Sequence, residues 1–183
     1  MHHSFILRRK SAALCALLLL TGATRAFGAL PGVHLLSCDA GGAVIEVTPP
    51  ELKVAAVEIA EREYADLTLP GWNQLLEAGK PNLPQGGVLL AIPPGTTATL
   101  AVEIIRTRRL ATPPILPAPD PDVVGKNALQ AAFFTDPAVY GGTSLYPAEW
   151  AQLGEPESQR NYRVLPVRIF PVRCSGSRGV VEI

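Results

Sequence analysis

Histidine and cysteine, which supply most catalytic and metal-binding groups, are scarce in this chain of 183 residues, with three of each. Two histidines and one cysteine lie in the first 28 residues, which leaves His34, Cys38 and Cys174 in the rest. One histidine and two distant cysteines do not make a zinc ligand set. A His34–Cys38 pair has no third group to orient it and no oxyanion hole. The sequence therefore predicts no catalytic site, no metal and no cofactor.

Long apolar runs are absent beyond the N-terminus, and the run that is present has the order of a secretory signal. Arg8-Arg9-Lys10 precedes an apolar segment at residues 11–23, and candidate cleavage sites follow Ala26 and Gly28. Thirteen residues are too few to span a bilayer comfortably. An uncleaved signal anchor is the rival interpretation. We expect residues 1–28 to be removed and residues 29–183 to be secreted and extracellular, with the periplasm or cell surface as alternatives and no membrane association.

An excess of positive charge is also missing. Four of the 16 Lys and Arg residues lie in the first 28 residues, so 12 remain against 16 acidic residues, a net charge of −4. Nucleic-acid binding needs a basic face, so this class of partner is excluded. Among the basic residues that remain, Arg106, Arg108 and Arg109 form a small cluster.

Two cysteines remain after the signal, and their state is open. An exported chain is compatible with a disulfide between Cys38 and Cys174. A disulfide needs close approach of the two side chains, and nothing in the sequence brings them together. One disulfide and two free thiols therefore both remain as interpretations.

Proline and glycine are abundant, at 18 and 16 residues, and they separate short apolar runs. Runs of this length with alternating polarity are typical of strands. The segment 53–63 fits helix and strand in part, and its neighbours favour strand. Val88–Ile92 and Thr97–Ile105 flank a Pro-Gly turn and predict a hairpin. The expected strands are residues 42–47, 53–63, 88–92, 97–106, 162–173 and the start of one at 180–183.

Prolines give two further expectations. Pro166 and Pro171 each remove a ladder donor, so the strand at 162–173 should lie at an edge or contain bulges. Five prolines between residues 113 and 121 predict an extended, exposed segment. Residues 128–134 fit a short helix or an irregular apolar plug. The segment from the proline run to residue 134 is a long irregular passage, and passages of this length are usually functional or disordered.

Together these patterns predict an all-β fold, an antiparallel, jelly-roll-like β-sandwich with long proline-rich loops. The last residues begin a strand that has no following turn. We therefore expect the domain at residues 29–183 to be truncated at its C-terminal end.

Three blocks of this sequence resemble the propeptide domain of the gingipain family of secreted bacterial cysteine peptidases. Gly79-Lys80-Pro81-Asn82-Leu83-Pro84, before the strand at 88–92, is similar to the family's Gly-x-Pro-x-Leu-Pro segment. Tyr140-Gly141 with Tyr146-Pro147 is similar to its central aromatic block. Arg160–Arg173, which ends in Phe-Pro-Val-Arg, is similar to its late strand.

The resemblance implies a β-sandwich pro-domain that keeps a peptidase latent during export and assists its folding. The partner would be the cognate catalytic domain, whose His–Cys dyad is not found in this chain. In the family a basic residue on a long loop fills the specificity pocket, and the matching residue here is Lys126, with Arg160 and Arg163 as alternatives. The Gly79–Thr96 stretch would be scaffold that helps to hold this loop. A different class of function, an exported adhesion or binding module, remains the alternative.

Overall fold

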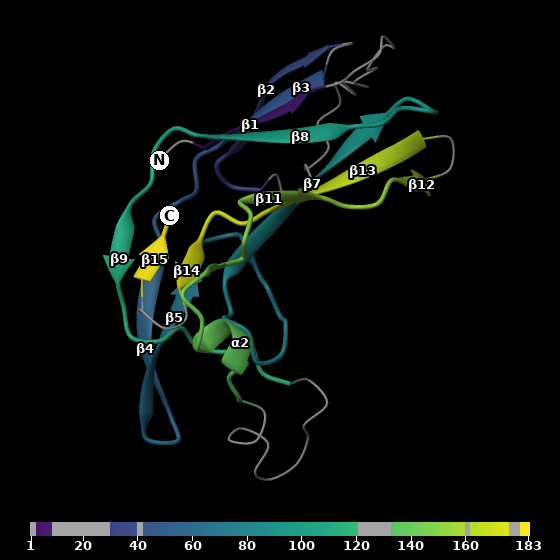
Figure 1. Ribbon diagram of the computed structural model, residues 1–183. Helices are drawn as coiled ribbons and strands as arrows, with labels where there is room; N and C mark the ends of the chain where they lie inside the picture. Colours follow the sequence, from purple (N-terminus) through teal and green to yellow (C-terminus); the bar gives the residue numbers. More distant parts are fainter. Residues whose placement is uncertain (1–2, 9–29, 40–41, 121–132, 160–161, 176–179) are drawn as a thin grey trace. The chain divides into compact units, whose positions relative to one another are not determined.

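The computed structural model describes residues 3–8, 30–39, 42–120, 133–159, 162–175 and 180–183 (Figure 1). The apolar segment at 11–23, both candidate cleavage sites, Lys126 and Arg160 lie outside the described residues. The signal-peptide boundary and the domain limits at 29–183 therefore stay predictions. No helix in the described ranges is long and apolar enough to cross a membrane.

The chain divides into two compact units. Unit 1 comprises Met1–Pro50, Gly86–Arg106 and Ala151–Ile169, and unit 2 comprises Glu51–Gln85, Thr107–Trp150 and Phe170–Ile183. All pairings between the named strands are antiparallel, which confirms the all-β class.

The first sheet of unit 1 has the order β2-β3-β1-β8. Its strands are β2 (Val33–Asp39), β3 (Gly42–Val47), β1 (His3–Arg8) and β8 (Thr99–Ile104). β3 buries Ala43, Ile45 and Val47 and leaves the alternate residues partly exposed, as expected for a strand with one covered face. β1 falls within the stretch expected to be a signal, and it pairs with both β3 and β8 (Figure 1).

The second sheet of unit 1 centres on β13 (Tyr162–Ile169), which pairs along one side with β7 (Pro84–Ile92). Two shorter strands pair with β13 on its other side: β11 (Ala151–Leu153) and β12 (Glu157–Gln159). Pro166 lies between the β13 residues that pair with each of them. Its carbonyl accepts a hydrogen bond from the Gly154 N–H at 2.8 Å. The strand is central, but its proline occupies a break in the ladder where no donor is needed.

The predicted hairpin of Val88–Ile92 with Thr97–Ile105 is wrong. β7 pairs with β13 and with β6 (Asn73–Gln74), whereas β8 pairs with β1. β7 ends at Ile92 and β8 begins at Thr99, so the connection is longer than the Pro-Gly turn alone suggests. A longer connection does not fix the register of a hairpin, and both strands find other partners.

In unit 2, β4 (Lys53–Ile59) and β5 (Arg62–Thr68) form a hairpin. The strand expectation for 53–59 is confirmed, while the turn at its end was missed. Ala60 and Glu61 hold φ of 52° and 61° there, although turns of this kind favour glycine or asparagine. The sequence therefore carries no turn signal at this position.

The other regular elements of unit 2 are short. A four-stranded sheet has the order β10-β14-β15-β9. These strands are β10 (Leu145–Tyr146), β14 (Arg173–Ser175), β15 (Val180–Glu182) and β9 (Arg109–Ala111), and the helix α2 spans Pro137–Tyr140. Leu67, Leu83 and Val172 are fully buried in this unit. Residues 121–132, the proline run's continuation, are not described.

Candidate functional site

The proline-rich run before residue 121 is partly buried, which corrects in part the expectation that it is exposed: Pro113 is exposed and Pro114 and Pro119 are half-buried. Ile115, Pro117 and Ala118 are at most 3% exposed. The Ala65 N–H donates to the Pro114 carbonyl, and the Leu116 N–H donates to the Ala65 carbonyl, both at 2.9 Å. Proline has no N–H to satisfy, so a proline-rich run needs few partners to be buried. The run is therefore a fixed stem for the residues that follow.

The segment Gly79–Asn82 holds this first stem. The Asn82 N–H donates to the Leu116 carbonyl at 2.9 Å, and the Ala118 N–H donates to the Lys80 carbonyl at 2.8 Å. The Gly79 N–H donates to the Ala118 carbonyl at 3.0 Å. These three bonds lie within the block that resembles the family's Gly-x-Pro-x-Leu-Pro segment.

Gly79 also binds the second stem, which begins at Phe133. Its carbonyl accepts a hydrogen bond from the Asp136 N–H at 2.8 Å. Its φ is +77°, and a Cβ at this position would lie 2.3 Å from Cε2 of Phe134. Only glycine satisfies both the backbone angle and the ring contact. One residue thus hydrogen-bonds both Ala118 and Asp136, which flank residues 121–132 in the sequence, and we call it the Gly79 clamp.

Helix α2 fixes the second stem further. The Asp136 carboxylate accepts a hydrogen bond from the Ala138 N–H at 2.9 Å, as an N-cap residue does. The Tyr140 hydroxyl donates to the Ile115 carbonyl at 2.7 Å, which ties the helix to the proline run. Burial raises the pKa of Tyr140 above its usual range, so the hydroxyl keeps its proton and this bond over the physiological pH range.

The three basic candidates fall in different places. Lys126 lies within residues 121–132, between the stems, and Arg160 also lies outside the described residues. Arg163 is in β13 of unit 1, where its Nη1 donates to the Thr96 carbonyl at 3.4 Å. The structure therefore does not bring Arg163 into the unit that carries the two stems.

The candidate nucleophiles, Cys38 and Cys174, lie in separate units. Cys38 lies four residues after the exposed His34 on the same strand, β2, in unit 1. Cys174 lies in unit 2, where burial raises its pKa to about 12. A reactive cysteine requires a lowered pKa, so this thiol has the opposite environment. Neither residue forms a disulfide in the described part of the chain.

Two features of the site could not be predicted from the sequence. Phe134 was assigned only to a possible apolar plug at residues 128–134, and no sequence pattern indicated its contact with Gly79. Arg109 was noted only as part of a basic cluster, yet its Nε donates to the buried Glu182 carboxylate at 2.8 Å. The two residues are 73 positions apart, so no local pattern announces the pair.

Comparison with known proteins places these observations in a family. The Propeptide_C25 family model matches residues 24–180. No curated protein sequence matches the chain.

Two solved structures share the fold. One is the complex of the Porphyromonas gingivalis RgpB pro- and mature domains, with 22% identity and a TM-score of 0.69, covering 84% of this chain and 78% of that chain. The other concerns the zymogenic latency of gingipain K from Porphyromonas gingivalis, with 20% identity and a TM-score of 0.60, covering 75% of this chain and 77% of that chain. With the family model covering most of the sequence, the chain belongs to the Propeptide_C25 family, the propeptides of gingipain-type cysteine peptidases.

Proposed function

We propose that this chain is the latency-maintaining inhibitor and folding assistant of a gingipain-type cysteine peptidase, exported by its N-terminal signal. Lys126 enters the specificity pocket of that enzyme. The observation that carries the proposal is the Gly79 clamp, in which a single residue hydrogen-bonds both stems of the segment that contains Lys126.

Fixed stems favour inhibition for an energetic reason. Ordering a flexible loop on binding opposes association, and part of this ordering is already present when both stems are held. The first stem buries Ile115, Pro117 and Ala118 and the second is capped by Asp136, so both are ordered before any partner binds. A long cationic side chain between them can then pair with an acidic pocket, and such charge pairs anchor complexes.

The choice of Lys126 over Arg163 follows from placement. Arg163 is part of β13 and already donates to a backbone carbonyl within unit 1. In the sequence, Lys126 falls between Ala118 and Asp136, and Gly79 hydrogen-bonds both of these residues, which supports the choice. The alternative Arg160 lies outside the described residues and gains no support from geometry.

Folding assistance follows from the same contact. A ligand that binds only the folded state of its partner stabilises that state by mass action. A propeptide that binds the native catalytic domain therefore raises the yield of that domain on refolding. The two structural neighbours, a complex of RgpB pro- and mature domains and a structure that concerns the zymogenic latency of gingipain K, support this type of partner.

The test is inhibition of a panel of mature C25-type peptidase domains that includes RgpB and gingipain K. We expect the purified chain to inhibit at least one of them competitively. Lys126→Ala should raise the inhibition constant at least roughly 30-fold, because a lost buried charge pair weakens binding by about 2 kcal/mol or more. Asn127→Ala is the matched control and should change it little. No inhibition of any domain would contradict the function, and equal inhibition by Lys126→Ala would contradict the role of Lys126.

A further inference from the structure

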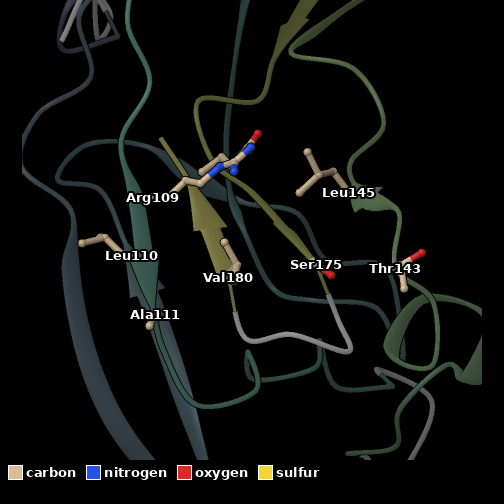
Figure 2. Close-up of a pocket in the computed structure, with 8 residues that line it drawn as sticks. Arg109, Leu110, Ala111, Thr143, Leu145, Ser175 and Val180 are labelled. Carbon is tan, nitrogen blue, oxygen red and sulfur yellow. The ribbon is translucent and has the colours of Figure 1, made fainter.

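Unit 2 contains a pocket of about 420 Å³ on one face of the β10-β14-β15-β9 sheet (Figure 2). Its volume is in the range of natural ligand sites. The strand register explains its lining, because Leu145, Ser175, Val180 and Ala111 stand opposite one another across the four strands. Figure 2 shows this row, which is apolar except for one hydroxyl.

A second row on the same face is ionic. Arg173, Glu182 and Arg109 stand opposite one another, each two residues from a member of the first row. Side chains two apart on a strand share a face, and Arg109 and Glu182 of this row line the same pocket as the first row. The Glu182 carboxylate is the shared acceptor between two guanidinium groups.

The exposed charge of this row belongs to Arg109. Its Nε and Nη2 lie 2.8 and 2.7 Å from Oε1 of Glu182, and Nη2 of Arg173 lies 3.3 Å from Oε2. Glu182 is 7% exposed, whereas the Arg109 side chain is 76% exposed. Arg173 is further held by the Ala148 carbonyl and the Trp150 ring. Two cations therefore face one anion, and the guanidinium that reaches solvent is held in place by the buried carboxylate.

The hydroxyl in the pocket lacks a partner. Ser175 is 5% exposed, and its Oγ has no hydrogen-bond partner among the described residues. Buried hydroxyls are normally satisfied by protein, water or ligand. The Arg109 side chain is 76% exposed, so part of its guanidinium reaches solvent. The pocket thus offers a fixed cation, a hydroxyl donor and an apolar wall.

We infer that this pocket binds an aspartate or glutamate side chain on an extended surface segment of the peptidase, an inference that rests on the proposed function. Arg109 and the Ser175 hydroxyl donate to the carboxylate oxygens, a pairing that is strong and directional for guanidinium groups. Leu145 and Val180 contact the apolar residue beside it. The occupant is acidic because the uncompensated charge of the site is positive. This contact is separate from that of Lys126 and adds a second point of attachment in unit 2.

The test uses one exposed position on β9, Ala111, which borders the pocket without being buried. Ala111→Glu, Ala111→Gln and Ala111→Lys introduce side chains of similar length but different charge. Comparing their Kd values therefore distinguishes steric from electrostatic effects on binding. The full-length variants are titrated against the peptidase domain that the wild type inhibits. We expect Ala111→Glu to raise the Kd at least about tenfold, Ala111→Gln to change it by less than about threefold and Ala111→Lys to leave it equal or lower. Equal effects of all three, or none from any, would overturn the inference.

Arg109→Gln gives an independent check, since it removes the charge and keeps a polar side chain. It should weaken binding about tenfold and flatten the salt dependence of the Kd, because the attraction it removes is screened by salt. An unchanged Kd and salt slope would overturn the inference. Lys126→Ala in the same titration keeps the two proposals apart. If Lys126→Ala weakens inhibition while the Ala111 series is flat, only the pocket assignment fails. If the wild type binds no peptidase, the proposed function fails with it.

Discussion

The two units reach order by different means. In unit 1, β1, β3 and β8 pair over six residues each, and the side chains of β3 and β8 alternate between more buried and more exposed positions. In unit 2, outside the β4–β5 hairpin, strands have two or three residues, and much of the backbone is satisfied by single bonds between irregular segments. Four of its prolines are fully buried, Pro81, Pro84, Pro117 and Pro171. The order of unit 1 therefore comes mainly from the hydrogen-bond ladders between its strands. The order of unit 2 comes mainly from buried residues and from individual backbone hydrogen bonds.

The two cysteines offer the largest contrast between the units. Burial raises the pKa of Cys174 to about 12 from 9.0, so at pH 8 its thiolate population falls roughly a thousandfold. Cys38 in unit 1 is partly exposed. We expect iodoacetamide to label Cys38 in the native protein and Cys174 only after unfolding. Mass spectrometry of labelled peptides measures both rates, with labelling in urea as the control. Equal rates in the native state would show that unit 2 opens readily around Cys174.

The same pKa shift predicts a pH dependence. The neutral thiol is favoured in the folded state, so its contribution to stability is present below pH 9 and is lost as the pH rises towards 12. Cys174→Ala should reduce the slope of the unfolding free energy in this range. An unchanged slope would mean that groups other than the Cys174 thiol cause the pH dependence of stability.

Matched leucine truncations compare the two cores. Leu83 in unit 2 is 0% exposed and Leu165 in unit 1 is 2% exposed. Each Leu→Ala change should lower the free energy of unfolding by about 3 kcal/mol, from lost burial plus the cavity left behind. Urea denaturation measures both. Leu83→Ala should weaken inhibition of the peptidase more than Leu165→Ala does. The reverse order would break the assignment of function to unit 2.

A pair of glycines isolates the Gly79 clamp. Gly79 and Gly95 have nearly equal φ, +77° and +70°, but a Cβ on Gly95 meets nothing within 4 Å. Gly95→Ala should therefore lower stability by about 1 kcal/mol from the backbone angle alone. Gly79→Ala should lower it by about 2–3 kcal/mol, because the Phe134 ring must also move. The difference should shrink in a Phe134→Ala background. A difference that persists there would assign the effect to another contact.

The smallest effect is expected at the exposed ion pair of Lys80 with Glu77, 2.6 Å apart with side chains 36% and 45% exposed. Pairs of this kind contribute about 0.2–1 kcal/mol. Glu77→Gln should therefore change the unfolding free energy by less than about 1 kcal/mol, and high salt should erase the difference. A larger loss would show that this pair, rather than the backbone of Gly79–Asn82, orders the segment.

Strands were predictable where periodicity and length agree. The runs at 42–47, 88–92 and 97–106 correspond to β3, β7 and β8, because alternation follows from a strand with one covered face. Their partners were not predictable, since alternation does not say which strand lies alongside. The β4–β5 turn was missed because Ala60 and Glu61 adopt positive φ without glycine.

The site was only partly predictable. The Gly-x-Pro-x-Leu-Pro resemblance marked Gly79–Pro84 as scaffold, and the structure adds that Gly79 itself binds both stems. Composition suggested that the proline run is exposed, but its residues Ile115, Pro117 and Ala118 are buried, and its backbone hydrogen-bonds Ala65 and Asn82. The Arg109–Glu182 pair depends on a contact across 73 residues, and a single sequence carries no signal for it.

The most direct test of the account is the inhibition constant of Gly79→Ala compared with that of Gly95→Ala, measured with the same peptidase at a temperature where circular dichroism shows both variants folded. If the Gly79 clamp presents Lys126, Gly79→Ala should inhibit at least about tenfold more weakly than wild type, and Gly95→Ala should match wild type. Phe134→Ala should restore part of the loss in the Gly79→Ala background. Equal inhibition by both glycine variants would contradict the claim that holding the two stems at Gly79 underlies latency.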